Sequence, residues 1–320
     1  MSHIDVFNGD ADGICALTQL RNASPADSTL VTGVKRDIAL LDRVEASPGD
    51  RVTVLDVSLD KNRDGLVAVL AAGASVFYAD HHFAGDIPDD PALEALIDTS
   101  PDVCTSLLVD RHLCGRFSNW AVTGAFGDNL EASAQALATS LGMDEEARAT
   151  LQRLGILLNY NGYGASVDDL HFPPDDLFRR ASRYADPLDF VKGDAETYGR
   201  LDAGYRDDMA NAESLTPVAA REHTAVFLLP DAPWARRVSG VYSNDLANAS
   251  PGRAHAVVTE RADGTYLVSV RAPLANKTGA DELCRRFPTG GGRKAAAGIN
   301  ALPADQLDAF IAAFEAHYDD

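Results

Sequence analysis

Short apolar runs rich in β-branched residues alternate with stretches of helical periodicity over residues 1–130. The apolar runs predict strands at Ile4–Phe7, Leu30–Thr32, Arg51–Leu55 and Ser75–Tyr78. The helical periodicity predicts helices at Gly13–Arg21, Ile38–Val44, Asp64–Ala72, Thr105–Leu113 and Trp120–Phe126. Because strands and helices alternate, we expect an α/β domain with a parallel sheet and crossover helices.

The pattern changes twice further along the chain. Residues 132–211 have a helical pattern throughout, with Gly, Pro and Asn breaks at 161–164 and 173–174. Strands are then predicted at Ala225–Leu229, Ala254–Thr259 and Thr265–Val270, and helices at Gly279–Arg286 and Ala304–Phe314. The sequence therefore predicts two domains, at residues 1–190 and 223–320, with a helical connector at 191–222 and the active site in the cleft between the domains. The second domain is expected to be a smaller α/β domain.

The composition is typical of a globular protein with a sizeable core. The chain has 320 residues, of which 46% are hydrophobic and 24% charged. Its net charge of −20 disfavours long duplex or single-stranded nucleic acid as a partner, because binding to such polymers depends on the neutralisation of phosphates. A short oligonucleotide held in a local basic cleft remains compatible with this charge.

Cysteine usage and the N-terminal sequence both indicate a cytoplasmic protein. Cys15, Cys104, Cys114 and Cys284 show no metal-ligand spacing, so we expect reduced and mostly buried thiols. The chain does not open with a basic segment followed by an apolar one, and no apolar run approaches the roughly 18 residues of a membrane span. We expect no membrane partner, and a homodimer stays open.

Acidic and imidazole side chains gather in four short clusters, each interpreted as the end of a strand. Asp80-His81-His82 directly follows a predicted strand, and the other clusters are Asn8–Gly13, Val54–Ser58 and Gly124–Asp128. Carboxylates and imidazoles at the carboxyl edge of a sheet hold divalent metals, and two such ions about 3.5–4 Å apart are a common device for phosphoester hydrolysis. The four clusters together indicate a metal-dependent phosphoesterase.

Three of the clusters also have a simpler interpretation when each is taken alone. Asp10 and Asp12 would share one face of a continuing strand, but a DxDG turn is more often an acidic loop or a helix cap. Asp56 could equally be a helix N-cap, and a His pair in a loop is often a surface feature. In combination, His81 can ligate metal while His82 faces substrate, and Asp80 is placed to hold the second nitrogen of an imidazole ligand.

In their order along the chain, the clusters resemble the motifs of the DHH phosphoesterase superfamily, which includes RecJ and nanoRNase-like enzymes. Asp10–Ile14 is similar to the first motif, Asp56 to the second, Asp80-His81-His82 to the third and Gly127-Asp128 to the fourth. The segment Gly290–Gly298 resembles the GGGHxxAAG signature of the DHH-associated substrate domain. The resemblance spans nearly the whole chain and implies a DHH domain followed by this smaller domain.

The resemblance implies two Mn²⁺ or Mg²⁺ ions bridged by Asp56, and the implied ligands are Asp10, Asp12, Asp56, His81 and Asp128. It also implies that water activated by both ions attacks phosphorus, while His82 binds the phosphate oxygen on which charge builds and Asp80 orients its neighbours. A carboxylate-rich ligand set independently favours Mn²⁺ or Mg²⁺ over zinc.

The C-terminal glycine run is followed by basic residues. Consecutive glycines allow backbone N–H groups to approach a phosphate, although such a run is more often a flexible turn. The predicted substrate-binding residues are Gly290, Gly291, Gly292, Arg293, Lys294 and Arg271. Lys35 and Arg36 are a weaker basic candidate, for which a solvated loop is the simpler interpretation.

Two positions depart from the family pattern. Val6 and Phe7 occupy the strand on which the phosphatase and pyrophosphatase branches carry a metal-binding His, and Asn8 stands where exonuclease branches often have Asp. Arg293 stands where the substrate domain commonly has His. These departures concern the completeness of one metal site and the substrate class.

We expect a Mn²⁺-dependent phosphodiesterase that hydrolyses short oligonucleotides or dinucleotides. The alternatives are a phosphomonoesterase acting on a bisphosphonucleotide and a nucleotide-binding sensor whose catalysis has lapsed, the latter motivated by Asn8 and the missing His. RecJ-type exonucleases carry an extra oligonucleotide-binding domain for which this chain has no spare length, which disfavours processive digestion of long strands.

Overall fold

The computed structural model describes residues 2–319, which form two compact units. The first unit ends at Ala203 and the second begins at Gly204. The boundary lies within helix α9 (Ala195–Glu213), inside residues 191–222, for which a connector is predicted.

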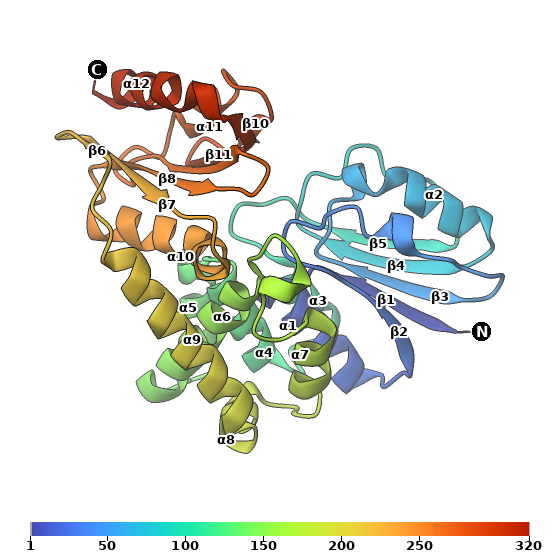
Figure 1. Ribbon diagram of the computed structural model, residues 1–320. Coiled ribbons are helices and arrows are strands. Elements are labelled where there is room, and N and C mark those ends of the chain that lie inside the picture. The colour runs from blue at the N-terminus through green and yellow to red at the C-terminus, as the bar shows by residue number, and fades with distance from the viewer. Residues whose placement is uncertain (1, 320) are drawn as a thin grey trace. The chain divides into compact units, whose positions relative to one another are not determined.

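The first unit contains a five-stranded parallel sheet with the strand order β2-β1-β3-β4-β5 (Figure 1). Its strands are β1 (His3–Phe7), β2 (Ser28–Val31), β3 (Arg51–Leu55), β4 (Ser75–Asp80) and β5 (Leu93–Ile97). The chain continues from β1 to β2 on one side and from β3 to β4 on the other. The carboxyl ends of β1 and β3 therefore flank the point at which the strand order changes direction. Sheets of this kind usually bind ligands at this point.

Helices cover both faces of this sheet. Helix α2 (Arg63–Ala71) packs over one face, while α1 (Ala11–Ala23) and α3 (Thr105–His112) lie over the other, with α4 (Ser118–Gly127) against them (Figure 1). The core beneath α2 includes Val6, Val54, Tyr78, Leu66 and Val69. Burial on both faces explains why β1, β3 and β4 read as nearly continuous apolar runs.

The described part of the first unit contains helices and loops but no strand after α4. They are α5 (Glu131–Ser140), α6 (Glu145–Gly162), α7 (Pro174–Ala181), α8 (Pro187–Gly193) and the start of α9. Asp144 and Asp186 cap α6 and α8 by accepting hydrogen bonds from backbone N–H groups of the first turn. The predicted helical character of residues 132–211 is confirmed.

The second unit contains a six-stranded mixed sheet with the order β10-β11-β9-β8-β7-β6. Its strands are β6 (Ala219–Ala220), β7 (Thr224–Leu229), β8 (Ala254–Glu260), β9 (Thr265–Arg271), β10 (Gly290–Gly292) and β11 (Ala296–Pro303). Its helices after α9 are α10 (Pro233–Ala249), α11 (Ala280–Cys284) and α12 (Leu307–Tyr318). Within this sheet, only β7 and β8 pair in parallel among the described strands, and α10 is their crossover helix. The α/β architecture predicted for both units is confirmed.

The helix predicted at Ile38–Val44 was wrong. Only Leu41–Arg43 forms a short 3-10 turn there. The side-chain amide of Asn62 donates to the carbonyl of Ile38 at 2.6 Å and accepts from the N–H of Leu41 at 3.0 Å, so it replaces helical hydrogen bonds. The apolar spacing reflects burial of Leu40 and Leu41 in the core.

Strand β5 and helix α10 were absent from the predicted elements. The sequence of β5, Leu-Glu-Ala-Leu-Ile, favours a helix by propensity, but it pairs with β4 over its whole length. Helix α10 contains Gly240 and several Ser and Asn residues of low helix propensity, and Pro233 in its first turn was the available signal. Tertiary pairing and packing overrode local propensity at both places.

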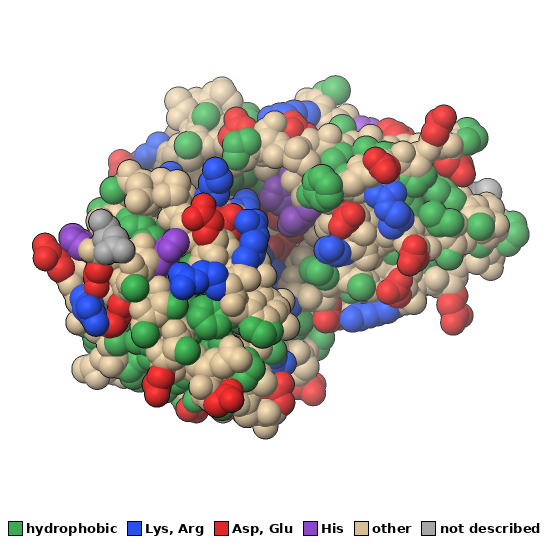
Figure 2. All heavy atoms as spheres, turned by 90° about the horizontal axis from the view of Figure 1, so that it is seen from above, with side chains coloured by type: hydrophobic (Ala, Val, Ile, Leu, Met, Phe, Trp, Pro, Cys, Tyr) green, Lys and Arg blue, Asp and Glu red, His purple; other side chains and the backbone are tan. Residues whose placement is uncertain are grey.

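The cysteines and the surface charge agree with what the sequence predicts. Cys15, Cys104 and Cys284 are buried, Cys114 is exposed, and all four are free thiols, as predicted. Figure 2 shows acidic side chains spread over the face that it presents, with Lys and Arg side chains among them. None of the helices within residues 2–319 combines the length and the hydrophobicity that a membrane span requires.

Gly13, in the first turn of α1, allows this helix to start directly against the end of β1. A Cβ atom at this position would lie 2.2 Å from the carbonyl oxygen of Asn8 and 2.9 Å from its nitrogen. We expect Gly13→Ala to destabilise the protein by about 1–3 kcal/mol, because the backbone must shift to remove the overlap. Urea unfolding measures this loss.

Gly199→Ala in α9 is the matched control. No atom outside the local helix backbone lies within 4 Å of its added Cβ. This substitution is expected to stabilise the protein by up to about 1 kcal/mol, since alanine is the better helix former. Equal unfolding midpoints for the two variants would contradict the close packing at Gly13.

Candidate metal centre

The first acidic pair belongs to the start of a helix. Asp10 is the N-cap of α1, and its Oδ1 accepts from the N–H groups of Asp12 at 3.0 Å and Gly13 at 3.1 Å. Asp10 and Asp12 do not share one face of a continuing strand, because the chain turns into α1 soon after β1 ends. The simpler interpretation of a helix cap is correct for Asp10.

Asp12 is fully buried and faces the start of α3. Its two carboxylate oxygens accept from the N–H groups of Thr105 and Ser106, each at 2.7 Å, and the Ser106 hydroxyl also donates to it. The N-terminal amides of a helix stabilise a negative charge. Carboxylate oxygens have further lone pairs, so Asp12 can still ligate a cation. These contacts were not predicted, although Thr105 and Ser106 open the predicted helix.

Asp56 directly follows β3 and is held in an unusual conformation. Its backbone has φ of 59°, and its side chain is buried among other carboxyl groups. Burial, followed by the nearby charges of Asp10, Asp12, Asp128 and Asp80, raises the pKa of Asp56 well above its usual value. A carboxyl group in these surroundings ionises readily only when positive charge is added, which is what a divalent cation supplies.

The two histidines of the Asp80-His81-His82 triplet have different partners. His81 Nδ1 donates to the carbonyl of Val103 at 2.9 Å, which leaves the lone pair of Nε2 available for a cation. This Nε2 lies 3.5 Å from Asp56 Oδ1 and 3.7 Å from Asp128 Oδ2. The acceptor that orients the His81 imidazole is therefore the Val103 carbonyl, and the expectation that Asp80 has this role was wrong.

Asp80 instead holds His82. The fully buried Asp80 accepts from His82 Nδ1 at 2.7 Å, while the side chain of His82 stays 46% exposed. Burial opposes protonation of His82, but the hydrogen bond and charge of Asp80 outweigh it, so the pKa of His82 is raised. An oriented, partly exposed imidazole of this kind is suited to donate a proton or a hydrogen bond to a substrate.

Asp128 comes from a helix, and the prediction that a strand ends at this cluster was wrong. It is the C-cap of α4, which packs against α1 and α6. Burial raises the pKa of Asp128, although the charge of Lys35 opposes this shift. Helix packing, rather than the edge of the sheet, brings this fourth acidic group to the others.

Potential ligand atoms form two groups within residues 2–319, each with its members less than 4.8 Å apart. The groups are Asp12, His81 and Asp128, and Asp56, His81 and His82. They contain four of the five predicted ligands, and His82 in addition. Carboxylates with one or two imidazoles match the preferences of Mn²⁺ and Mg²⁺, and the raised pKa values of Asp56 and Asp128 indicate a shortage of positive charge. The residues present therefore fit a divalent cation.

Lys35 lies among these carboxylates, so its interpretation as part of a solvated loop was wrong. Its Nζ is 2.5 Å from Asp10 Oδ2, 3.0 Å from Asn159 Oδ1 and 3.8 Å from Asp128 Oδ1. Burial opposes the charge of Lys35, but the carboxylate of Asp10 outweighs it and the pKa of the ammonium is raised well above its usual value. The available sequence signal was a basic pair after a strand in a strongly acidic chain.

The predicted substrate-binding residues lie together within the second unit. Gly290–Gly292 is strand β10, paired with β11, so the flexible-turn interpretation was wrong. A Cβ atom at Gly290 would lie 1.8 Å from the Cys284 carbonyl oxygen, and one at Gly292 would lie 2.5 Å from Ala297 Cα, so close packing accounts for both glycines.

The basic residues of this set occupy the hairpin turn and the strand beside it. Arg293 and Lys294 are exposed in the turn between β10 and β11, which Arg293 closes with backbone hydrogen bonds to and from Ala296. Arg271, the last residue of β9, is opposite Ala296 and donates to Asn244 Oδ1 at 2.8 Å. The basic residues therefore lie at the same end of the neighbouring strands β10, β11 and β9.

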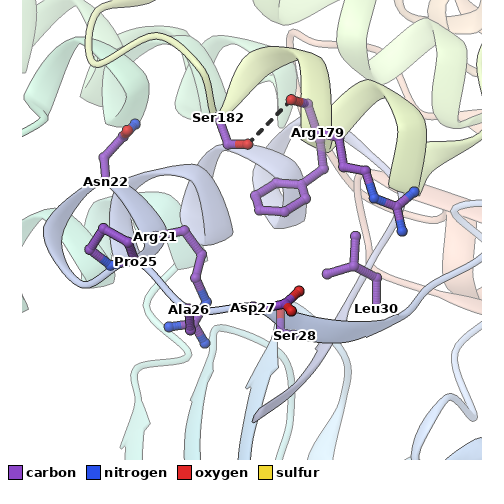
Figure 3. Close-up of a pocket in the computed structure, with 10 residues that line it drawn as sticks. Arg21, Asn22, Pro25, Ala26, Asp27, Ser28, Leu30, Arg179 and Ser182 are labelled. Carbon is purple, nitrogen blue, oxygen red and sulfur yellow. Dashed lines mark hydrogen bonds between the residues drawn. The ribbon is translucent and has the colours of Figure 1, made fainter.

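A pocket of about 430 Å³ opens elsewhere on the first unit, between the end of α1, β2 and α7 (Figure 3). Its lining residues include Arg21, Ser28, Phe178, Arg179 and Ser182 but none of the predicted site residues. The cations at its wall are paired, Arg21 with Asp5 and Arg179 with Asp175. We assign this pocket no role in the chemistry of the metal centre.

Comparison with solved structures shows the fold. The exonuclease RecJ bound to manganese matches with a TM-score of 0.62 and 20% identity, over 98% of this chain and 89% of that one. A pGpG-specific phosphodiesterase, PggH from Vibrio cholerae, matches with a TM-score of 0.59 and 15% identity over 99% and 100%. An exopolyphosphatase-related protein from Bacteroides fragilis matches with a TM-score of 0.53 and 16% identity over 98% and 90%.

These likenesses concern the fold and leave the substrate open. No family model and no curated protein matches this sequence. Identities of this size establish the fold alone, and the three matched proteins are named for different substrates. The fold expected from the resemblance to the DHH phosphoesterases is confirmed.

Proposed function

We propose that this chain, which has the fold of the DHH phosphoesterases, is a divalent-metal-dependent phosphodiesterase that acts on dinucleotides or short oligonucleotides. The observation that carries the proposal is that two groups of potential ligands share His81, one with Asp12 and Asp128 and the other with Asp56 and an oriented His82. The proposal is supported by the fold shared with an exonuclease and with a pGpG-specific phosphodiesterase. The net charge of −20 further favours short substrates over long polymers.

Each residue has a separate role in this proposal. The carboxylates and His81 of these two groups would hold Mn²⁺ or Mg²⁺, which supplies positive charge for the phosphate and lowers the pKa of bound water toward neutrality. Asp12 is fixed by the amides of α3, and His81 by the Val103 carbonyl, so both ligands are oriented in advance. His82, held by Asp80 through Nδ1, presents its other nitrogen to the oxygen on which negative charge develops.

We further propose that Arg271 and the turn with Arg293 and Lys294 bind a substrate phosphate. Guanidinium and ammonium groups at the same end of neighbouring strands in an acidic chain are suited to this role. The free thiols support a reducing, cytoplasmic location as part of the same proposal.

Product analysis with Mn²⁺ tests the substrate class. The purified chain is expected to release mononucleotides from pGpG faster than it releases phosphate from 3′-phosphoadenosine 5′-phosphate or from polyphosphate. Preferential release of inorganic phosphate from the bisphosphonucleotide would favour the phosphomonoesterase. Tight nucleotide binding without turnover of any of the three would favour the lapsed sensor, for which the departure at Asn8 is the specific observation.

Phe83 provides a test for recognition of a nucleobase. This side chain directly follows His82 and is 72% exposed, and the Ser58 hydroxyl donates to its carbonyl at 2.9 Å, which fixes its backbone. An exposed ring beside the phosphate-binding residue is suited to stack on a base, an interaction worth about 1–3 kcal/mol. We expect Phe83→Ala to raise KM for pGpG by about tenfold and to change kcat little.

Val67→Ala, at an exposed apolar position of α2, is the control for this substitution. It should leave KM and kcat for pGpG unchanged. If Phe83→Ala also leaves KM unchanged, Phe83 does not contact the substrate.

A further inference from the structure

Both oxygens of Asp10 already have partners. Oδ1 accepts the two backbone N–H groups that start α1, and Oδ2 accepts from Lys35 Nζ at 2.5 Å. Asp10 belongs to neither group of convergent ligand atoms found within residues 2–319. This arrangement differs from the expectation that Asp10 ligates a metal.

The Lys35 ammonium is fixed from several directions. It donates to Asp10 and, at 3.0 Å, to Asn159 of α6, and it lies 5.5 Å from the centre of the Tyr163 ring. The backbone N–H of Lys35 also donates to the Gly162 carbonyl at 2.8 Å. Contacts to the side chain and to the backbone therefore hold this cation in one place.

Asn8 connects this lysine to the first acidic motif. Its side-chain oxygen accepts from the N–H of Asp10, and its amide nitrogen donates to the Lys35 carbonyl, both at 3.2 Å. An ionised aspartate at position 8 could accept from Asp10 but could not donate to Lys35. Asn8 thus holds the backbone of the loop that carries Lys35, a contact that an ionised aspartate could not make.

We propose that Lys35 takes the place of one of two metal ions, so that the chain binds a single divalent cation. The cation is held at His81, which belongs to both groups of ligand atoms, together with carboxylates of those groups, while the ammonium of Lys35 supplies the fixed positive charge beside Asp10. A second divalent ion on Asp10 would have to displace Lys35 from the carboxylate and would meet its like charge. The inference rests on the metal dependence proposed above. It reduces the number of bound divalent ions from two to one.

Metal counting on the full chain tests this inference without an activity assay. Protein stripped with a chelator and dialysed against increasing Mn²⁺ is expected to bind one Mn²⁺ per chain, by elemental analysis and calorimetry, with the electron paramagnetic resonance signal of an isolated ion. Lys35→Met should bind two Mn²⁺ per chain with an exchange-coupled signal, because it frees Asp10 and removes the like charge. The double variant Asn8→Asp with Lys35→Met should bind the second ion more tightly still.

Two controls match this design. Lys61→Met removes an exposed ammonium paired with Asp60, and Lys35→Arg keeps a positive charge, so both should bind one ion. Two ions in the wild type, or one ion in a folded Lys35→Met, would overturn the inference. If Lys35→Met does not fold, two ions in Lys35→Arg or in the wild type overturn it, and one ion in both supports it.

The result is separable from that of the proposed function. Two Mn²⁺ in an active wild type would reject the single-ion site and leave the phosphodiesterase standing. A chain that binds no Mn²⁺ and hydrolyses no phosphodiester would reject both.

Discussion

Replacement of Asp56 by asparagine is expected to lower phosphodiester hydrolysis by about a thousandfold or more, since the bound cation supplies several kcal/mol of transition-state stabilisation. Asp56 lies 3.5 Å from Nε2 of His81, and burial together with the charges of four neighbouring aspartates raises its pKa. Loss of its charge should also weaken Mn²⁺ binding. Steady-state kinetics and calorimetry on the same preparation measure both effects.

Asparagine is the appropriate substitution because of the backbone at this position. Asp56 has a positive φ of 59°, a conformation that asparagine tolerates and that costs alanine roughly 1 kcal/mol. Asp56→Asn should therefore fold as the wild type does, so that lost activity reports on the metal centre. Asp60→Asn, beside Lys61 in the following turn, is the matched control and should retain full activity. If Asp56→Asn keeps most of its activity, the assignment of the whole site fails.

Replacement of His82 by glutamine is expected to lower kcat by about a hundredfold to a thousandfold, the usual cost of losing one donor to a developing negative charge. Mn²⁺ binding should change little, because His81 and the carboxylates remain. Asp80→Asn should act in the same direction, since Asp80 holds the His82 ring at 2.7 Å. The two substitutions should be non-additive, because Asp80 acts through His82.

The measurement must separate a substrate-facing His82 from a metal-ligating one. His82 belongs to the ligand group with Asp56 and His81, so metal affinity is the deciding quantity. His112→Gln, at an exposed position of α3, controls for the loss of an imidazole and should be neutral. A marked loss of Mn²⁺ affinity in His82→Gln would assign His82 to the metal and leave the phosphate without this donor.

The local sequence was sufficient to identify the acidic and imidazole residues that follow the parallel strands. Apolar runs separated by helical stretches can satisfy their burial only as a covered parallel sheet, and its carboxyl edge then collects the residues at the ends of β1, β3 and β4. Asp10, Asp12, Asp56 and the triplet were identified in this way. Their number and order along the chain also carried the resemblance to the phosphoesterase fold, which the structure confirms.

The tertiary structure alone decided which groups complete the site. Asp128 arrives on α4, the orienting carbonyl of Val103 precedes α3, and Lys35 reaches Asp10 from a loop across the site. Strand β5 likewise depends on pairing with β4, against its own propensity. Periodicity reports which residues share a face of one element, whereas contacts between elements depend on packing that no local pattern encodes. The sequence therefore determined the candidate ligands that follow the strands, and the packing of helices and loops decided that Asp128 and Lys35 lie beside them.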